Sequence, residues 1–111
     1  MGNNVIYASE NRIFSVDATA SRYTVKQVQG VTTKLNVDKL ASNSSAVFAG
    51  SFDKTLMKIE GDAAAGFSVT KTVALTSKAV DIACSEDSIF VLQHTGELTE
   101  LNAADLAVKK S

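Results

Sequence analysis

The amino-acid sequence predicts an all-β fold made of short antiparallel strands in a repeated unit. Similar segments recur about every 42 residues along the 111-residue chain. These segments are short, rich in β-branched and aromatic residues, and separated by turn residues, as strands are. Some segments alternate polar and apolar side chains, whereas others carry apolar side chains on both faces, as expected where sheets are stacked on one another.

The repeat is clearest where pairs of apolar residues recur in register. Leu40-Ala41 stands 42 residues before Ile82-Ala83, and at the same offset Val47-Phe48 precedes Ile89-Phe90. Val5-Ile6 lies a further 42 residues upstream. A period near 42 is typical of the four-stranded blades of a β-propeller. The sequence thus predicts β-propeller blades of four antiparallel strands, about three blades in number, which form an incomplete ring unless they are assembled.

Each blade is expected to run from an inner strand a to an outer strand d. Strand a is predicted at 35–41 and 79–84, strand b at 5–8, 46–50 and 88–92, strand c at 12–16, 55–59 and 97–101, and strand d at 23–28, 67–73 and 106–109. The first copy lacks strand a. The blades of this single propeller segment, 1–111, would occupy about 1–29, 30–75 and 76–111.

Burial is predicted from the spacing of apolar residues. In 67–73 they alternate with Ser and Thr, so one face of strand d should be buried and the other exposed. Apolar residues in strand c are three apart, so both of its faces should be covered. We expect Leu56, Ile59, Phe90 and Leu101 to be buried.

Two alternatives remain open from the residues alone. A small α+β or sandwich domain could contain strands that merely look repeated. The last segment, 103–110, could also form a short helix, because its Ala, Leu and Lys residues favour helix.

The second copy carries a more specific pattern. Its stretch 49–60, AGSFDKTLMKIE, resembles the WD-repeat signature, with Ile59-Glu60 where that family has Trp-Asp. Val16-Asp17 and Leu101-Asn102 occupy the same places in the other copies. The chain has no tryptophan and lacks the Gly-His pair that opens strand a in the family. We therefore expect the family's buried His–Ser/Thr–Asp–Trp hydrogen-bond network to be absent, and apolar packing to hold the blades together.

Composition argues against several classes of protein. The net charge is −1 and no basic stripe is visible, so no nucleic-acid partner is expected. No segment approaches the roughly 20 apolar residues of a membrane span, and the N-terminus has no secretory signal pattern. A single cysteine, Cys84, cannot form an internal disulfide. The expected location is cytoplasmic or nuclear.

The sequence shows no constellation for catalysis. His94 is the only histidine and has no evident nucleophile or carboxylate near it, so we interpret it as a surface turn residue. Cys84 ends an apolar strand, which favours a place in the core. Together they fall short of a zinc ligand set. No enzyme activity, cofactor or metal is expected.

The predicted function is a non-catalytic protein-interaction scaffold, as the WD-repeat resemblance implies. Phe52, at the tip of a b–c turn, could either anchor a partner or fold over an adjacent blade. The remaining candidate contacts are Asp53, Lys54, His94, Glu10, Asn11 and Arg12, with Gln29, Gly30, Thr76 and Lys78 in the d–a loops of the same face. The partner is expected to be a protein. The strands missing from the ring would come from further polypeptide of a longer propeller, from a second copy of the chain or from a different chain, and a second copy is favoured. The alternative is a ligand- or carbohydrate-binding propeller or an enzyme with a site in the central channel.

Overall fold

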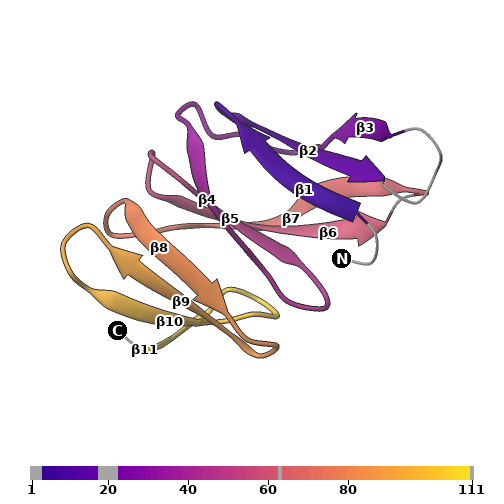
Figure 1. Cartoon of the computed structure of the whole chain (residues 1–111). Coiled ribbons are helices and arrows are strands. Elements are labelled where there is room, and N and C mark those ends of the chain that lie inside the picture. Colours follow the sequence, from indigo (N-terminus) through magenta and orange to yellow (C-terminus); the bar gives the residue numbers. More distant parts are fainter. Residues whose placement is uncertain (1–3, 18–22, 63, 111) are drawn as a thin grey trace.

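A computed structural model describes residues 4–17, 23–62 and 64–110. These residues contain strands and turns but no helix, and they form three antiparallel sheets that lie face against face (Figure 1). The all-β prediction is confirmed. The prediction of blades is likewise confirmed, since three open sheets stacked in this way match an incomplete propeller.

Each sheet is one blade, with its strands in chain order or the reverse of it. Blade 1 contains β1 (Asn4–Ser9), β2 (Arg12–Asp17) and β3 (Thr24–Gln27). Blade 2 contains β4 (Val37–Ser42), β5 (Val47–Ser51), β6 (Thr55–Asp62) and β7 (Gly66–Ala74). Blade 3 contains β8 (Ala79–Cys84), β9 (Ser88–Gln93), β10 (Leu98–Asn102) and β11 (Val108–Lys110).

The 42-residue repeat is also present in the strand pairing. Ala41 pairs with Phe48 in blade 2, and Ala83 pairs with Phe90 in blade 3. The inner strand has a register shift at the same place in both blades, between Val37 and Lys39 and between Ala79 and Asp81. A bulge conserved at one repeat position shows that the two blades are built alike.

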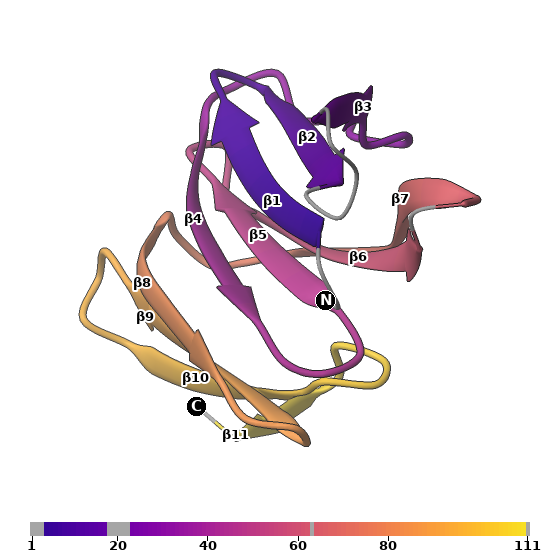
Figure 2. The same ribbon diagram turned by 45° about the vertical axis from the view of Figure 1, so that its right-hand side comes forward.

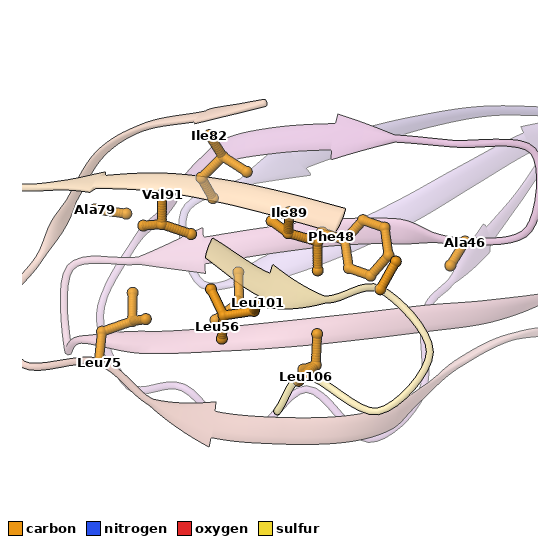
Figure 3. Packing of buried hydrophobic residues seen from close by; sticks show 11 residues of the cluster. Ala46, Phe48, Leu56, Leu75, Ala79, Ile82, Ile89, Val91, Leu101 and Leu106 are labelled. Atoms are coloured by element: carbon orange, nitrogen blue, oxygen red, sulfur yellow. The ribbon is translucent and has the colours of Figure 1, made fainter. Parts of the chain in front are cut away.

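The three blades meet at two junctions (Figure 2), and each junction is filled by a layer of buried apolar residues. Leu56 and Leu101 are buried between blades 2 and 3, and Ile59 is buried between blades 1 and 2, as predicted. The cluster between blades 2 and 3 is drawn in Figure 3 and comprises Ala46, Phe48, Leu56, Leu75, Ala79, Ile82, Ile89, Val91, Leu101, Ala103 and Leu106.

The prediction that Phe90 is buried is wrong. Its side chain is 38% exposed, whereas Phe48, at the same repeat position, is fully buried. Phe48 points from blade 2 into the layer that blade 3 covers. One face of blade 3 packs against blade 2, and Phe90 points from the other face of blade 3. No further blade among the described residues covers that face. Burial at this position therefore depends on the following blade.

The two outermost blade faces are apolar and exposed. We call the side of a blade that faces the preceding blade its front face, and the side that faces the following blade its back face. Exposed apolar residues on the front face of blade 1 include Val5, Tyr7 and Val25. Those on the back face of blade 3 include Phe90, Leu92 and Leu98. The fold thus presents one uncovered apolar face at each end.

Two further expectations need correction. In β7, a register shift opposite Lys58 and Ile59 turns the apolar residues from one side to the other, so Val69 packs toward blade 1 and Val73 toward blade 3. The proposed helix at 103–110 is instead a turn followed by β11. Leu106 closes that turn with a positive φ of 62° and is buried between blades. This burial outweighs the helix propensity of the segment.

Candidate partner-binding face

The turns predicted to carry partner contacts lie together along one edge of the blades (Figure 1). We define the loop face as residues 10–12, 33–36, 52–54, 76–78 and 94–96. Backbone hydrogen bonds tie these segments together. Val37 N donates to Glu10 O at 2.7 Å, and Phe52 N donates to Asn36 O at 2.9 Å. His94 N donates to Lys78 O at 2.8 Å, so each of the three b–c turns is bonded to a residue at or just before the start of an inner strand.

Phe52 is partly exposed and partly covered by a residue that precedes blade 3. Its side chain is 42% exposed, so part of the ring is open to a partner. The Nζ atom of Lys78, from the loop that precedes blade 3, lies 3.9 Å from the ring centroid. A cation–π contact of this kind fixes the ring and stabilises an exposed site by about 0.5–1 kcal/mol. Phe52 is therefore an aromatic side chain held in place and only half covered.

The carboxylate of Asp53 is engaged within blade 2. It accepts hydrogen bonds from Thr33 Oγ1, at 2.6 Å, and from the Ser51 hydroxyl. Burial alone would raise the pKa of Asp53, but these hydroxyls outweigh it. Together with weaker hydrogen bonds from Thr55 and the Lys34 backbone, they lower that pKa from 3.8 to about 2. Asp53 thus stabilises the turn, and Lys54 beside it is exposed with a positive φ of 68°.

Polar networks inside blades 2 and 3 add to the apolar packing between the blades. Thr33, Ser51 and Asp53 form a polar network in blade 2 without histidine or tryptophan. Blade 3 has a different polar network at the corresponding repeat position. Gln93 accepts a hydrogen bond from Ser77 N at 2.8 Å, and its Nε2 donates to Thr99 Oγ1 at 2.9 Å. The residue types differ between the copies, so pattern matching missed both networks.

The loop face carries four cations that form no ion pair among the described residues. They are Arg12, Lys34, Lys54 and Lys78. The carboxylates nearby are Glu10, Asp53 and Glu97, of which Asp53 and Glu97 already accept hydrogen bonds from hydroxyl groups. This leaves the exposed side chains of the face with an excess of positive charge.

Sequence reasoning missed Lys34 and Leu35 because it placed residue 35 in an inner strand. The strand begins at Val37, and Leu35 lies in the preceding bend with 49% of its side chain exposed. The opposite error concerns Gln29 and Gly30, which the sequence assigned to the same face as the b–c turns. Gln29 pairs with Ser68 of the outer strand β7, so these two residues lie away from the turns.

His94 and Cys84 show no arrangement for catalysis. The ring of His94 is exposed and makes no hydrogen bond within the described part of the chain. Cys84 is half-buried against the apolar layer between blades 2 and 3. Burial, with a further contribution from Glu86, raises the pKa of its thiol, which opposes the reactive thiolate form.

A polar cavity lies at the opposite edge, between blades 2 and 3. Its volume is about 510 Å³, and Lys58, Asp87, Asn102 and Lys109 contribute to its lining. Lys58 Nζ donates to Ala104 O at 2.6 Å, and Asn43 Nδ2 donates to Ser85 O at 3.2 Å. These contacts link the two blades on the side away from the loop face.

Two other kinds of feature are absent from residues 4–17, 23–62 and 64–110. Within these ranges no group of three or more His, Cys, Asp or Glu side chains is placed to hold a metal ion. No helix there is long and apolar enough to span a membrane.

Comparison with known proteins supports the fold. No protein-family model matches the chain, and no curated protein matches it by sequence. Among solved structures, the crystal structure of Sqt1 from Saccharomyces cerevisiae, a WD40 protein, is similar with a TM-score of 0.72 and 13% sequence identity. The match covers 97% of this chain and 31% of that chain, so the chain spans about a third of the length of Sqt1. Three stacked sheets and this similarity together show propeller-like blades.

Proposed function

We propose that this chain is a non-catalytic protein-interaction scaffold that binds its partner through the loop face. The observation that carries the proposal is Phe52, an aromatic ring that is half exposed yet fixed by Lys78 of the next blade. Exposed aromatic side chains that are already ordered are typical binding anchors, because little side-chain entropy is lost when the partner arrives.

The surroundings of Phe52 suggest the chemistry of the partner. Leu35 adds exposed apolar surface, and Arg12, Lys34, Lys54 and Lys78 add unpaired positive charge. A protein segment that places an apolar side chain against Phe52 and carboxylates around it would complement both features. Glu10, Asn11 and His94 would contribute to the rim of the same face.

The propeller fold also supports a role in assembly. The apolar front face of blade 1 and back face of blade 3 each resemble a junction that the chain elsewhere buries. We propose that residues 1–111 act as one unit whose ring is completed by another chain, in the cytoplasm or nucleus.

A photo-crosslinking amino acid at position 52 tests the loop-face proposal. We expect it to capture a protein partner, whereas the same amino acid at the exposed position 105, outside the loop face, captures none. The purified partner is then titrated against Phe52→Ala and Lys78→Ala, and each change should raise Kd by roughly 10–100-fold.

Lys71→Ala is the matched control, since it removes one positive charge from the exposed outer strand β7. It should leave Kd within about two-fold of the original value. Equal effects of Lys71→Ala and Lys78→Ala would show that general charge, and not the loop face, attracts the partner. An unchanged Kd in folded Phe52→Ala protein would contradict the proposal.

A further inference from the structure

The polar cavity between blades 2 and 3 has the size of a small-molecule site. Its volume of about 510 Å³ falls within the range of about 300–1,000 Å³ that is usual for ligand pockets. The β4–β5 turn, the β8–β9 turn and the loop between β10 and β11 surround it, and these segments lie close together in both views (Figure 1 and Figure 2). Ala46, Ala103 and Ala104 contribute to its lining, and their short side chains leave the space unfilled.

The charged side chains of this cavity are separated by depth. Lys58 has only 11% of its side chain exposed and, with the buried residues Ala46 and Ala103, forms the floor. Glu86 and Asp87 also line the cavity but are exposed, so they form its rim. A ligand that enters the cavity therefore passes two carboxylates and reaches an ammonium group.

The ammonium group at the floor has unused donor capacity. It carries three N–H donors, and among the described residues Lys58 Nζ donates one hydrogen bond, to Ala104 O at 2.6 Å. Glu60 Oε1 lies 3.6 Å from this nitrogen, beyond ordinary hydrogen-bond length, and already accepts a hydrogen bond from Thr70 Oγ1 at 2.6 Å. A buried ammonium group gains from every further acceptor, and a carboxylate supplies two oxygens.

The rim carries negative charge that the chain does not neutralise. Lys109, the second cation of the lining, lies 3.8 Å from a carboxylate oxygen of Glu100 and is thereby paired. The Glu86 carboxylate accepts hydrogen bonds from the Ser44 backbone N, at 3.0 Å, and from the Ser44 hydroxyl, which fix its position. Within the described ranges the Asp87 carboxylate makes neither a hydrogen bond nor an ion pair. A cation at the rim would therefore be attracted to both carboxylates.

From this arrangement we infer that the polar cavity binds a small amino acid in its zwitterionic form. The carboxylate of the ligand bonds to Lys58 at the floor, and its ammonium group faces Asp87 and Glu86 at the rim. A simple anion would be repelled by the rim, and a simple cation would be repelled by the floor. The cavity lies on the edge opposite the loop face, so binding there is independent of the proposed protein partner.

Titration with L-valine, followed through the amide NMR signals of Ser45, Asp87 and Ala104, tests this inference. The signals should shift saturably, with a dissociation constant in the millimolar range that suits so small a ligand. Isovalerate and isobutylamine have the same apolar part but lack the ammonium group and the carboxylate, respectively. Each of them should bind ~10-fold or more weakly than L-valine, because it satisfies only one end of the cavity.

Variants at the two ends of the cavity separate the two contacts. Lys58→Met keeps the length of the side chain and should raise Kd for L-valine by ~10-fold or more, with loss of the preference over isobutylamine. Asp87→Asn should raise Kd by ~3–10-fold and reduce the preference over isovalerate, since Glu86 remains. Lys71→Met, on the exposed strand β7, is the control and should leave Kd unchanged.

Circular dichroism checks that each variant is folded. If Lys58→Met does not fold, Asp87→Asn decides alone, because its exposed carboxylate makes no contact that the fold requires. Three results would each overturn the inference: no saturable shift at ~50 mM L-valine, equal binding of L-valine and isobutylamine, or unchanged ligand preference in the folded variants. Loop-face binding measured on Asp87→Asn protein should be unaffected, so failure of the cavity site and failure of the proposed partner binding give different results.

Discussion

Asp53 shows how single side chains replace the hydrogen-bond network expected of a WD-like blade. Its carboxylate accepts hydrogen bonds from Thr33 and Ser51, which join the loop before β4 to the β5–β6 turn. The lowered pKa of Asp53 means that the ionised form is favoured by folding. This gives the stability of blade 2 a defined dependence on pH.

Asp53→Asn tests that dependence. A carboxyl whose pKa falls to about 2 on folding stabilises the fold above its ordinary pKa of 3.8, and the gain is lost as the pH drops toward 2. The original protein should exceed the variant by about 1 kcal/mol near pH 6, a modest value because solvent screens this partly exposed group. The difference should disappear near pH 2. Urea unfolding between pH 6 and pH 2 gives the comparison.

Asp38→Asn, at an exposed position of β4, controls for the loss of one negative charge. A stability difference between Asp53→Asn and the original protein that stays constant down to pH 2 would show that the hydrogen bonds do not depend on ionisation.

Phe90 marks the limit of sequence reasoning at the residue scale. Phe48 and Phe90 have equivalent positions and similar neighbours in sequence, so the pattern predicts the same burial for both. The following blade covers one and not the other. Local sequence specifies the face of the sheet from which a side chain points. Whether that side chain is buried depends on whether another blade packs on that face.

At the scale of elements, most strands were predictable because their two-residue alternation and turn residues are local signals. The start of β4 was not predictable, because Leu35 is apolar and yet lies outside the strand, which begins at Val37. The register shift in β7 was also not predictable, because it depends on pairing with β6. The turn before β11 formed against helix propensity because Leu106 gains burial between the blades.

Gly50 on β5 limits how closely blades 2 and 3 approach. Gly50→Ala should destabilise the protein by about 1 kcal/mol, because the added Cβ would lie 2.8 Å from Ile82 Cδ1, which can turn aside, and 3.2 Å from Ala79 Cβ, which cannot. Ile82→Val removes that Cδ1 atom and by itself should cost about 0.5–1.5 kcal/mol. The double variant should be more stable than the sum of the two losses predicts, as measured by thermal unfolding.

Additive losses in the double variant would mean that the Gly50–Ile82 approach is not the source of the strain. Ala49→Gly on the opposite face of the same strand is a useful comparison, since its neighbours belong to the other apolar layer. Its cost should be the same with and without Ile82→Val.

For the whole molecule, the sequence predicted that the b–c turns gather on one edge, because each turn comes at the same point of the repeat. The β5–β6 turn, which contains Phe52 and Lys54, and the β9–β10 turn, which contains His94, lie along that edge (Figure 1). Lys34 and Lys78 could be assigned to this face only from the structure, because the paths of the loops before β4 and β8 follow no repeat. The interaction of Lys78 with Phe52 likewise depends on the packing of two blades.

The same kind of apolar blade face is buried between blades 2 and 3 and exposed on the back of blade 3. Unfolding of Phe48→Ala and Phe90→Ala at several protein concentrations tests this difference most directly. Phe48→Ala should lose about 3–5 kcal/mol at every concentration, because blade 3 of the same chain covers it. Phe90→Ala should lose stability only where another chain covers that face, and the loss should vanish on dilution. Equal, concentration-independent losses in the two variants, or no loss in Phe48→Ala, would contradict the account.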